Sequence, residues 1–265
     1  MKTLLIGDTH LMCRLILPSL DKIIEEQNVK RLILMGDYTD QWGAIGCPDM
    51  YKNDLRFLYW WKSEMTARGV LVVLLTGNHG IPYLIGEPMY YSVMSPYAFD
   101  WIKEMLYDLG LQIAYRLEDY LVSHAGFTKD YEPLTWHFEV LTVDHKDRLA
   151  WLHNHAGLSR GGRYVTGSPV WADLNGDMLE FYHQDYPKQI VGHTPITSID
   201  LTDNIIGVDT FSLSRSHVPL GNGEMFLYED GRLSVIEHPI WNDDVVGKYF
   251  DENLQIISKT ELKRL

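Results

Sequence analysis

The chain has 265 residues, of which 46% are hydrophobic, so it can bury one large core or two small ones. Its formal net charge of −13 argues against a broad nucleic-acid-binding surface, because such surfaces neutralise phosphates with lysine and arginine. No apolar run reaches the roughly eighteen residues of a membrane span, and Asp8 follows the N-terminus too closely for a signal peptide. We therefore expect a globular cytoplasmic protein without a membrane partner, whose oligomeric state the sequence leaves open.

Cysteine usage predicts neither a disulfide framework nor a zinc-thiolate site. The chain has only Cys13 and Cys47, without C-x-x-C spacing. We expect two buried or half-buried thiols.

Three early segments share one pattern, in which an apolar run ends abruptly at glycine and a polar cluster. They are KTLLIGDTH, VKRLILMGDYTD and GVLVVLLTGNH. Near-continuous apolar runs are typical of strands in a sheet that is covered on both faces. The segments between them have helical patterns, one with Leu17, Leu20 and Ile24 on a stripe and the other ending at Gly69. This order predicts three parallel strands whose polar clusters meet at the carboxyl edge of the sheet.

The pattern changes after a further predicted helix that ends at Gly110. Residues 111–126 predict two strands joined by a turn at Glu118 and Asp119. Four more short strands are predicted within residues 188–238, and we expect the later strands to form a second sheet packed on the first. Residues 129–174, rich in tryptophan and histidine, predict a helical and loop excursion beside the site. With no internal repeat or linker, we expect a single domain over residues 1–265.

Five strand ends carry side chains that bind metals. Asp8 and His10 are two residues apart in an extended segment, so both can contact one ion. Mixed carboxylate, imidazole and amide ligands suit Mn, Fe or Zn better than calcium. Asp37 lies in the central cluster and is the natural bridge between two ions. The strand-end side chains are Asp8, His10, Asp37, Asp40, Asn78, His79, His124 and His193.

Each motif has an ordinary explanation when taken alone. Aspartate and histidine are common in turns, Asn78 could hold a left-handed turn, and GHTP could be a capped turn before Pro195. These explanations do not account for five clusters in order, each after an apolar run. The set as a whole therefore favours a metal-dependent site.

The ordered motifs GDTH, GDYTD, GNH, SHAG and GHT resemble the calcineurin-like metallophosphoesterase family, and they are most similar to its phosphoprotein phosphatase branch. The resemblance spans residues 7 to about 195. It implies an α/β fold, a four-layer α/β/β/α sandwich of two mixed sheets with two divalent or trivalent metal ions between them. It also implies hydrolysis of phosphate monoesters, on phosphoproteins or small molecules, by attack of a metal-bridging hydroxide.

The resemblance implies a role for each motif residue. His79 would protonate the departing oxygen, and Asp40 would orient its ring. One metal ion would be bound by Asp8, His10 and Asp37, and the other by Asp37, Asn78, His124 and His193.

The chain departs from the family pattern where a phosphate-binding arginine is expected, because Gln41 and Trp42 follow Asp40. Glutamine lacks the charged fork with which arginine binds phosphate. Arg160 and Arg163, in the loop LSRGGRYVTGSP, are candidate replacements, and Gln41 is a third candidate substrate contact. A solvated loop is an equally good explanation for either arginine.

Two further features have weaker interpretations. We expect the histidines of HNH at 153–155 to lie on the surface of a helix. Asp209, in GVDTF, is expected to orient the site from a strand of the second sheet or to be structural.

The missing arginine leaves alternatives open. One is a phosphodiesterase or a dinucleoside polyphosphate hydrolase, since binding a diester requires less positive charge from the protein. Another is a non-catalytic metal-binding scaffold with the same fold. The intact set of strand-end ligands argues against the scaffold, because a scaffold has no chemical need for all of them.

Overall fold

Two stacked β-sheets form the centre of the computed structural model, which describes the backbone of residues 1–261 and the side chains of residues 1–254. The first sheet has the strand order β3-β2-β1-β8-β9 and the second has the order β4-β5-β6-β7. The strands are β1 (Thr3–Ile6), β2 (Arg31–Leu34), β3 (Leu71–Leu74), β4 (Ala114–Leu117), β5 (Tyr120–Ser123), β6 (Gln189–Val191), β7 (Ile205–Gly207), β8 (Glu224–Glu229) and β9 (Arg232–Glu237).

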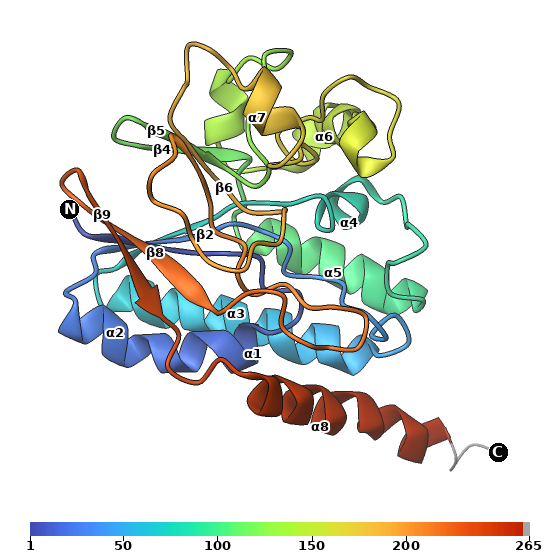
Figure 1. The fold of residues 1–265 in the computed structure, drawn as a ribbon. Coiled ribbons are helices and arrows are strands. Elements are labelled where there is room, and N and C mark those ends of the chain that lie inside the picture. The colour runs from blue at the N-terminus through green and yellow to red at the C-terminus, as the bar shows by residue number, and fades with distance from the viewer. Residues whose placement is uncertain (262–265) are drawn as a thin grey trace.

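Helices cover the outer face of each sheet. In Figure 1, α1, α2, α3 and α5 lie on one side of the first sheet, while α6 and α7 lie beyond the second. This arrangement confirms the predicted sandwich. The helices are α1 (Cys13–Ile16), α2 (Leu20–Glu26), α3 (Pro48–Ala67), α4 (Ile81–Ile85), α5 (Pro96–Asp108), α6 (Lys146–His153), α7 (Asp177–Phe181) and α8 (Asp243–Glu261), with short 3₁₀ turns η1 (Leu17–Ser19), η2 (Thr135–Phe138), η3 (Val143–His145) and η4 (Leu158–Arg160).

The first three strands are parallel, as the sequence predicts, and β2 lies between β1 and β3. Successive side chains of a strand point to opposite faces of its sheet. On β1, Leu5 packs into the core between the sheets, while Leu4 and Ile6 pack into the core under the helices. Both faces are buried, which explains why these strands do not alternate polar and apolar residues.

The C-terminal hairpin corrects one prediction. We expected β8 and β9 to belong to the second sheet, but β8 pairs antiparallel with β1 and extends the first sheet. On β8, Phe226 packs between the sheets and Met225 packs under the helices, so this strand is covered on both faces like its neighbour. An apolar strand pattern shows that a strand is buried and does not show which edge it joins.

The second sheet is mixed. Its first two strands form the predicted antiparallel hairpin, with Glu118 in the turn at a φ of 53°. The strands β5, β6 and β7 are parallel. The ends of β5 and β6 therefore point the same way, toward the polar edge of the first sheet.

The excursion at 129–174 and the C-terminal helix complete the described structure. Helix α6 of the excursion packs against α4, the short helix that follows the third polar cluster. Helix α8, which the sequence analysis did not identify, contributes Val246 and Phe250 to the core. Both Cys13 and Cys47 are buried, and no described helix combines the length and apolarity that a membrane crossing requires.

Candidate metal centre

The carboxyl ends of strands from both sheets converge at one place. Glycines at these ends allow the close approach. A Cβ atom at Gly77 would collide with the carboxylate of Asp37 and the ring of His124, and one at Gly192 would collide with the carboxylate of Asp8. Gly77 and Gly192 therefore provide space for the neighbouring side chains.

The structure brings all six residues named as metal ligands together. His10 Nε2 lies 3.8 Å from Asp37 Oδ2, and Asn78 Oδ1 lies 3.1 Å from His124 Nε2. Four of the six residues form the tightest group, in which one ligand atom from each lies within 4.8 Å of the others. They are Asp8, Asp37, His124 and His193.

Backbone carbonyls orient two of the imidazoles. His124 Nδ1 donates to the carbonyl of Met35 at 3.0 Å, which leaves Nε2 with a lone pair directed at the cluster. His10 Nδ1 lies 2.8 Å from the carbonyl of Asp40, and its Nε2 faces Asp37. Each carbonyl thus places a proton on Nδ1 and leaves Nε2 as the nitrogen that can face a metal ion.

The two central carboxylates are buried close together. Burial raises the pKa of Asp8 well above its usual value, and Asp209 and Asp37 add to that rise. Burial acts in the same direction on Asp37, but His124, His79 and His10 outweigh it and lower the pKa of Asp37. Such a pocket of buried anionic oxygens matches a cation, and its mixed donor set fits Mn, Fe or Zn.

The buried histidines favour their neutral form. Burial lowers the pKa of His124 and lowers that of His193 well below its usual value. Asp209, which follows β7 of the second sheet, is fully buried, and its Oδ2 accepts a hydrogen bond from Ser212 at 2.8 Å. It stands beside the cluster as expected, where its charge acts on Asp8.

Several of these residues hold a left-handed backbone. The φ angles are 37° at His10, 47° at Asp37, 58° at Asp40 and 62° at His193. Residues other than glycine seldom adopt this region, and such strain collects at functional sites.

His79 is held at the edge of the cluster. Its Nδ1 lies 3.2 Å from Asp40 Oδ2, and its backbone N–H donates to Asp37 Oδ1 at 2.9 Å. Burial would lower the pKa of His79, but Asp37 and Asp40 outweigh it, so the pKa is raised. The other oxygen of Asp40 accepts from the hydroxyls of Tyr51 at 2.9 Å and Tyr83 at 2.6 Å. These tyrosines, which the sequence analysis missed, fix the carboxylate that faces His79.

The three candidate substrate contacts differ in position. Gln41 is buried, and both ends of its amide contact backbone, at Trp42 N–H and the His10 carbonyl. Arg160 lies beside the cluster, where its Nη2 donates to the His193 carbonyl at 3.3 Å. Its Nε lies 2.8 Å from Asp173 Oδ2. Arg163 is exposed, and its guanidinium lies over the ring of Tyr164.

The prediction of surface histidines at 153–155 is wrong for His153, which is 8% exposed. Its ring packs against Trp171 at a centroid distance of 5.6 Å, and Trp171 meets the ring of His193 edge-on at 5.7 Å. A signal was present, since Leu149 and His153 are four residues apart on α6 and share its buried face. Trp171 stands in the motif SPVWADL, to which the sequence analysis gave no role.

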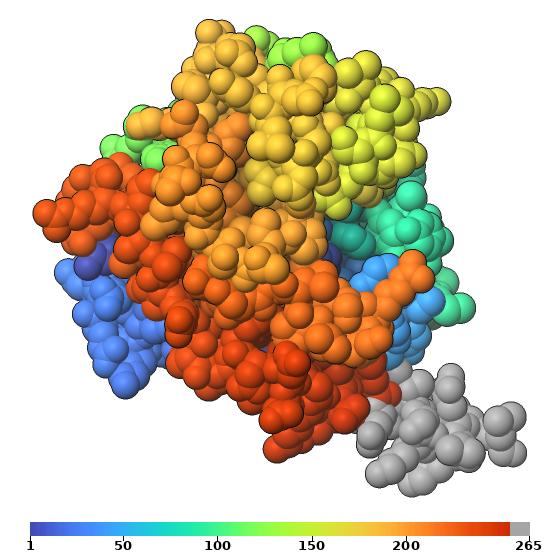
Figure 2. Space-filling model, viewed as in Figure 1, coloured from blue at the N-terminus to red at the C-terminus, as the bar shows by residue number. Residues whose placement is uncertain are grey.

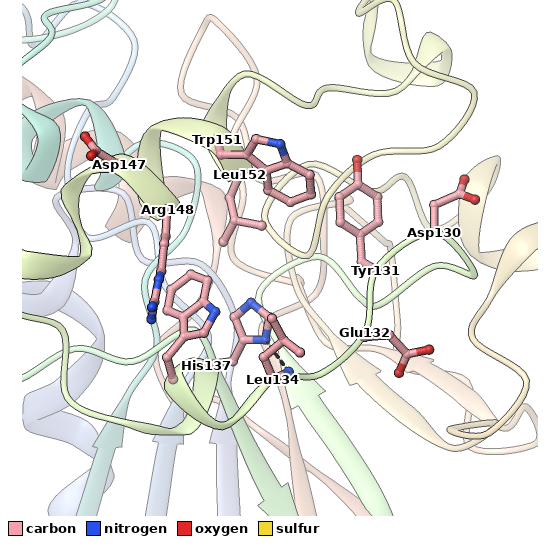
Figure 3. Close-up of a pocket in the computed structure, with 10 residues that line it drawn as sticks. Asp130, Tyr131, Glu132, Leu134, His137, Asp147, Arg148, Trp151 and Leu152 are labelled. Carbon is pink, nitrogen blue, oxygen red and sulfur yellow. Dashed lines mark hydrogen bonds between the residues drawn. The ribbon is translucent and has the colours of Figure 1, made fainter.

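A separate hollow lies within the excursion, and we call it the outer pocket. Its volume is about 470 Å³. Figure 3 shows the rings of Tyr131 and Trp151 facing it, with the carboxylates of Asp130 and Glu132 along one margin. None of the candidate metal ligands lines it.

A family model for calcineurin-like phosphoesterases matches residues 1–197. The chain belongs to the calcineurin-like phosphoesterase family. This membership confirms the resemblance carried by the five motifs, and it makes the chain a metal-dependent, phosphatase-like hydrolase. A search of curated proteins found no match.

Solved phosphatase structures share the fold of this phosphoesterase. One is the cold-active protein-tyrosine phosphatase of a psychrophile, Shewanella sp., with 19% identity and a TM-score of 0.59 over 89% of this chain and 78% of that chain. Another is a protein serine/threonine phosphatase from Saccharomyces cerevisiae with similarity to human phosphatase PP5. It has 12% identity and a TM-score of 0.51 over 91% of this chain and 82% of that chain.

Proposed function

We propose that this phosphoesterase hydrolyses phosphate monoesters, on phosphoproteins or small molecules, with two metal ions chosen from Mn, Fe and Zn. One observation carries the proposal. Asp37 Oδ2 lies between two imidazole nitrogens, 3.8 Å from His10 Nε2 and 3.4 Å from His124 Nε2. A carboxylate between two sets of nitrogen ligands is suited to bridging two ions.

The six ligands would divide around Asp37. When bound, a metal pair supplies a hydroxide nucleophile at neutral pH and offsets negative charge on the phosphate. The lowered pKa values of His124 and His193 favour neutral rings, which can bind such ions without first losing a proton. The proposed ligands are Asp8, His10 and Asp37 for one ion, and Asp37, Asn78, His124 and His193 for the other.

His79 is the proposed general acid. Asp37 and Asp40 outweigh burial and raise its pKa, which shifts the ring toward the protonated form that can give a proton to the departing oxygen. Asp40 would fix the ring through the contact at Nδ1, and the tyrosines would hold Asp40 in turn.

Arg160 is the better candidate of the two arginines for contacting the substrate phosphate. Its guanidinium lies beside His193, whereas Arg163 is exposed and contacts Tyr164. Asp173 and Thr194 hold the Arg160 side chain, so it is ordered before substrate arrives. A contact between Gln41 and substrate would require its amide to leave the backbone groups that it now binds.

The named neighbours favour the monoester proposal, because both are protein phosphatases. The alternative is a diesterase or dinucleoside polyphosphate hydrolase, and the uncharged Gln41 next to Asp40 is the observation that favours it.

Rates on p-nitrophenyl phosphate and bis-p-nitrophenyl phosphate, measured with added Mn, test the proposal. We expect faster hydrolysis of the monoester. Faster hydrolysis of the diester would support the alternative. Bound metal with no hydrolysis of either ester would contradict both and favour a scaffold.

A further inference from the structure

Three aromatic residues near the metal centre each have a buried polar atom without a hydrogen-bond partner among the described residues. The atoms are Tyr91 Oη, His153 Nδ1 and Trp171 Nε1. Buried polar atoms in native proteins almost always have partners. Three unpaired atoms in one neighbourhood therefore point to a ligand that the chain does not itself supply.

The three rings lie around the candidate site. Tyr91 packs on the ring of His79 at a centroid distance of 4.4 Å. Trp171 contacts His193, and His153 contacts Trp171 in turn.

The surface view agrees with this placement. Figure 2 shows a recess where the excursion, in yellow, meets the segments that follow β2 and β3, in blue and blue-green. Tyr91 belongs to the segment after β3, while His153 and Trp171 belong to the excursion. Residues distant in the sequence thus contribute to one side of the site.

All three groups are neutral hydrogen-bonding groups at pH 7. Trp171 Nε1 can only donate. Burial raises the pKa of the Tyr91 hydroxyl and lowers the pKa of His153 to about 4. A ligand that satisfies all three atoms must offer several acceptors, and the non-bridging oxygens of a phosphate do so.

We propose that Tyr91, His153 and Trp171 form a donor collar that hydrogen-bonds the phosphate oxygens of the substrate, where the family pattern would use arginine. The collar rests on the proposed function, since it needs a phosphoester at the metal centre. His153 takes part with its proton on Nδ1.

Ring-preserving substitutions test the collar. Tyr91→Phe removes only the hydroxyl, while Trp171→Phe and His153→Phe remove the ring N–H and keep a smaller or equal aromatic ring in place. Inorganic phosphate is titrated calorimetrically into each Mn-loaded protein. We expect each variant to bind phosphate about tenfold more weakly, as for loss of one hydrogen bond to a charged group, with unchanged Mn content. KM for p-nitrophenyl phosphate should rise in parallel.

Trp151→Phe is the matched control, because Trp151 lies on α6 with His153 but faces the outer pocket. It should leave phosphate binding unchanged. Parent-like phosphate affinity in all three collar variants would overturn the collar and assign the atoms to ordered water. That result would leave the proposed function intact if the parent hydrolyses the monoester. A parent that binds neither Mn nor phosphate would overturn both proposals.

Discussion

The metal centre and the outer pocket are both lined by histidine and aromatic rings, but their polar atoms are satisfied differently. In the outer pocket, His137 Nδ1 accepts from the Leu134 N–H at 2.9 Å, and the Arg148 guanidinium lies 5.5 Å from the centre of the Trp136 ring. Among the described residues, no lining residue of this pocket has a buried polar atom without a partner.

At the metal centre, by contrast, His193 Nε2 and the three collar atoms lack partners. The outer pocket is a cavity of about 470 Å³, yet no buried side-chain polar atom of its described lining lacks a partner. The unpaired aromatic atoms therefore lie beside the candidate metal centre and not in the outer pocket.

The largest expected effect comes from Asp37. Asp37→Asn removes the charge between the two sets of ligands, and we expect metal affinity to fall by more than about 100-fold, beyond the effect of outer-shell substitutions, with loss of activity. Metal analysis after dialysis measures this. Asp54→Asn is the control, because Asp54 is equally buried but accepts from the backbone N–H groups of Cys13 and Arg14. Full metal content in Asp37→Asn would remove the proposed bridge.

The next effect separates proton transfer from metal binding. His79→Asn should lower kcat for p-nitrophenyl phosphate by about 100-fold, because a general acid contributes at least that much. Metal content should stay at the parental value, since His79 is not a proposed ligand. A variant as fast as the parent with its metals retained would exclude His79 as the acid.

Arg160 and Arg163 give a smaller, paired comparison. Arg160→Ala should raise KM for small phosphoesters by about tenfold through the loss of one charge-assisted contact, whereas Arg163→Ala should change it less than about twofold. Steady-state kinetics at matched metal content provide the measurement. An unchanged KM in both variants would exclude Arg160 and Arg163 as replacements for the missing arginine.

The last prediction concerns stability and pH at the outer pocket, where no effect on catalysis is expected. Burial lowers the pKa of His137 to about 4, so between about pH 4 and 6.5 the unfolded chain binds more protons than the folded one. Stability from this group is present above about pH 6.5 and is lost as the pH falls through that window. His137→Asn should therefore lose about 2 kcal/mol less than the parent between pH 7 and pH 5.

Urea unfolding at several pH values checks this expectation. His145→Asn is the control for loss of the turn's hydrogen bond, because half-buried His145 accepts from the Thr142 N–H at 3.0 Å in the same kind of turn. If the free energy of unfolding changed equally with pH in His137→Asn and in the parent, the lowered pKa of His137 would be contradicted.

The strand ends were predictable because apolar runs, glycines and polar residues are adjacent in the sequence. The carboxyl ends of parallel strands meet at one edge, so the sequence alone predicts that Asp8, Asp37 and Asn78 lie together. The partner of β8 could not be predicted, because both faces of a central strand are buried whichever neighbour it pairs with. Helix α8 was not predicted, although Val246 and Phe250 are four residues apart on it and share its buried face.

Residues supplied by the excursion were harder to predict. The position of His153 depends on how α6 packs against α4, and a helical stripe does not reveal which neighbour it meets. Tyr51 and Tyr83 reach Asp40 from two helices, and nothing in their local sequence indicates a carboxylate partner. Long-range packing therefore determines the part of the site that sequence patterns do not show.

The left-handed residues at the metal centre limit how the protein can be re-engineered. Aspartate, asparagine and histidine tolerate positive φ better than other side chains except glycine, and they are also the residue types of the proposed metal ligands. A variant library at His10, Asp37 and His193 that is selected only for folding, with no requirement for activity, should therefore still be enriched in these residue types and in glycine. At these positions, residue preference alone is insufficient evidence that a relative is catalytically active.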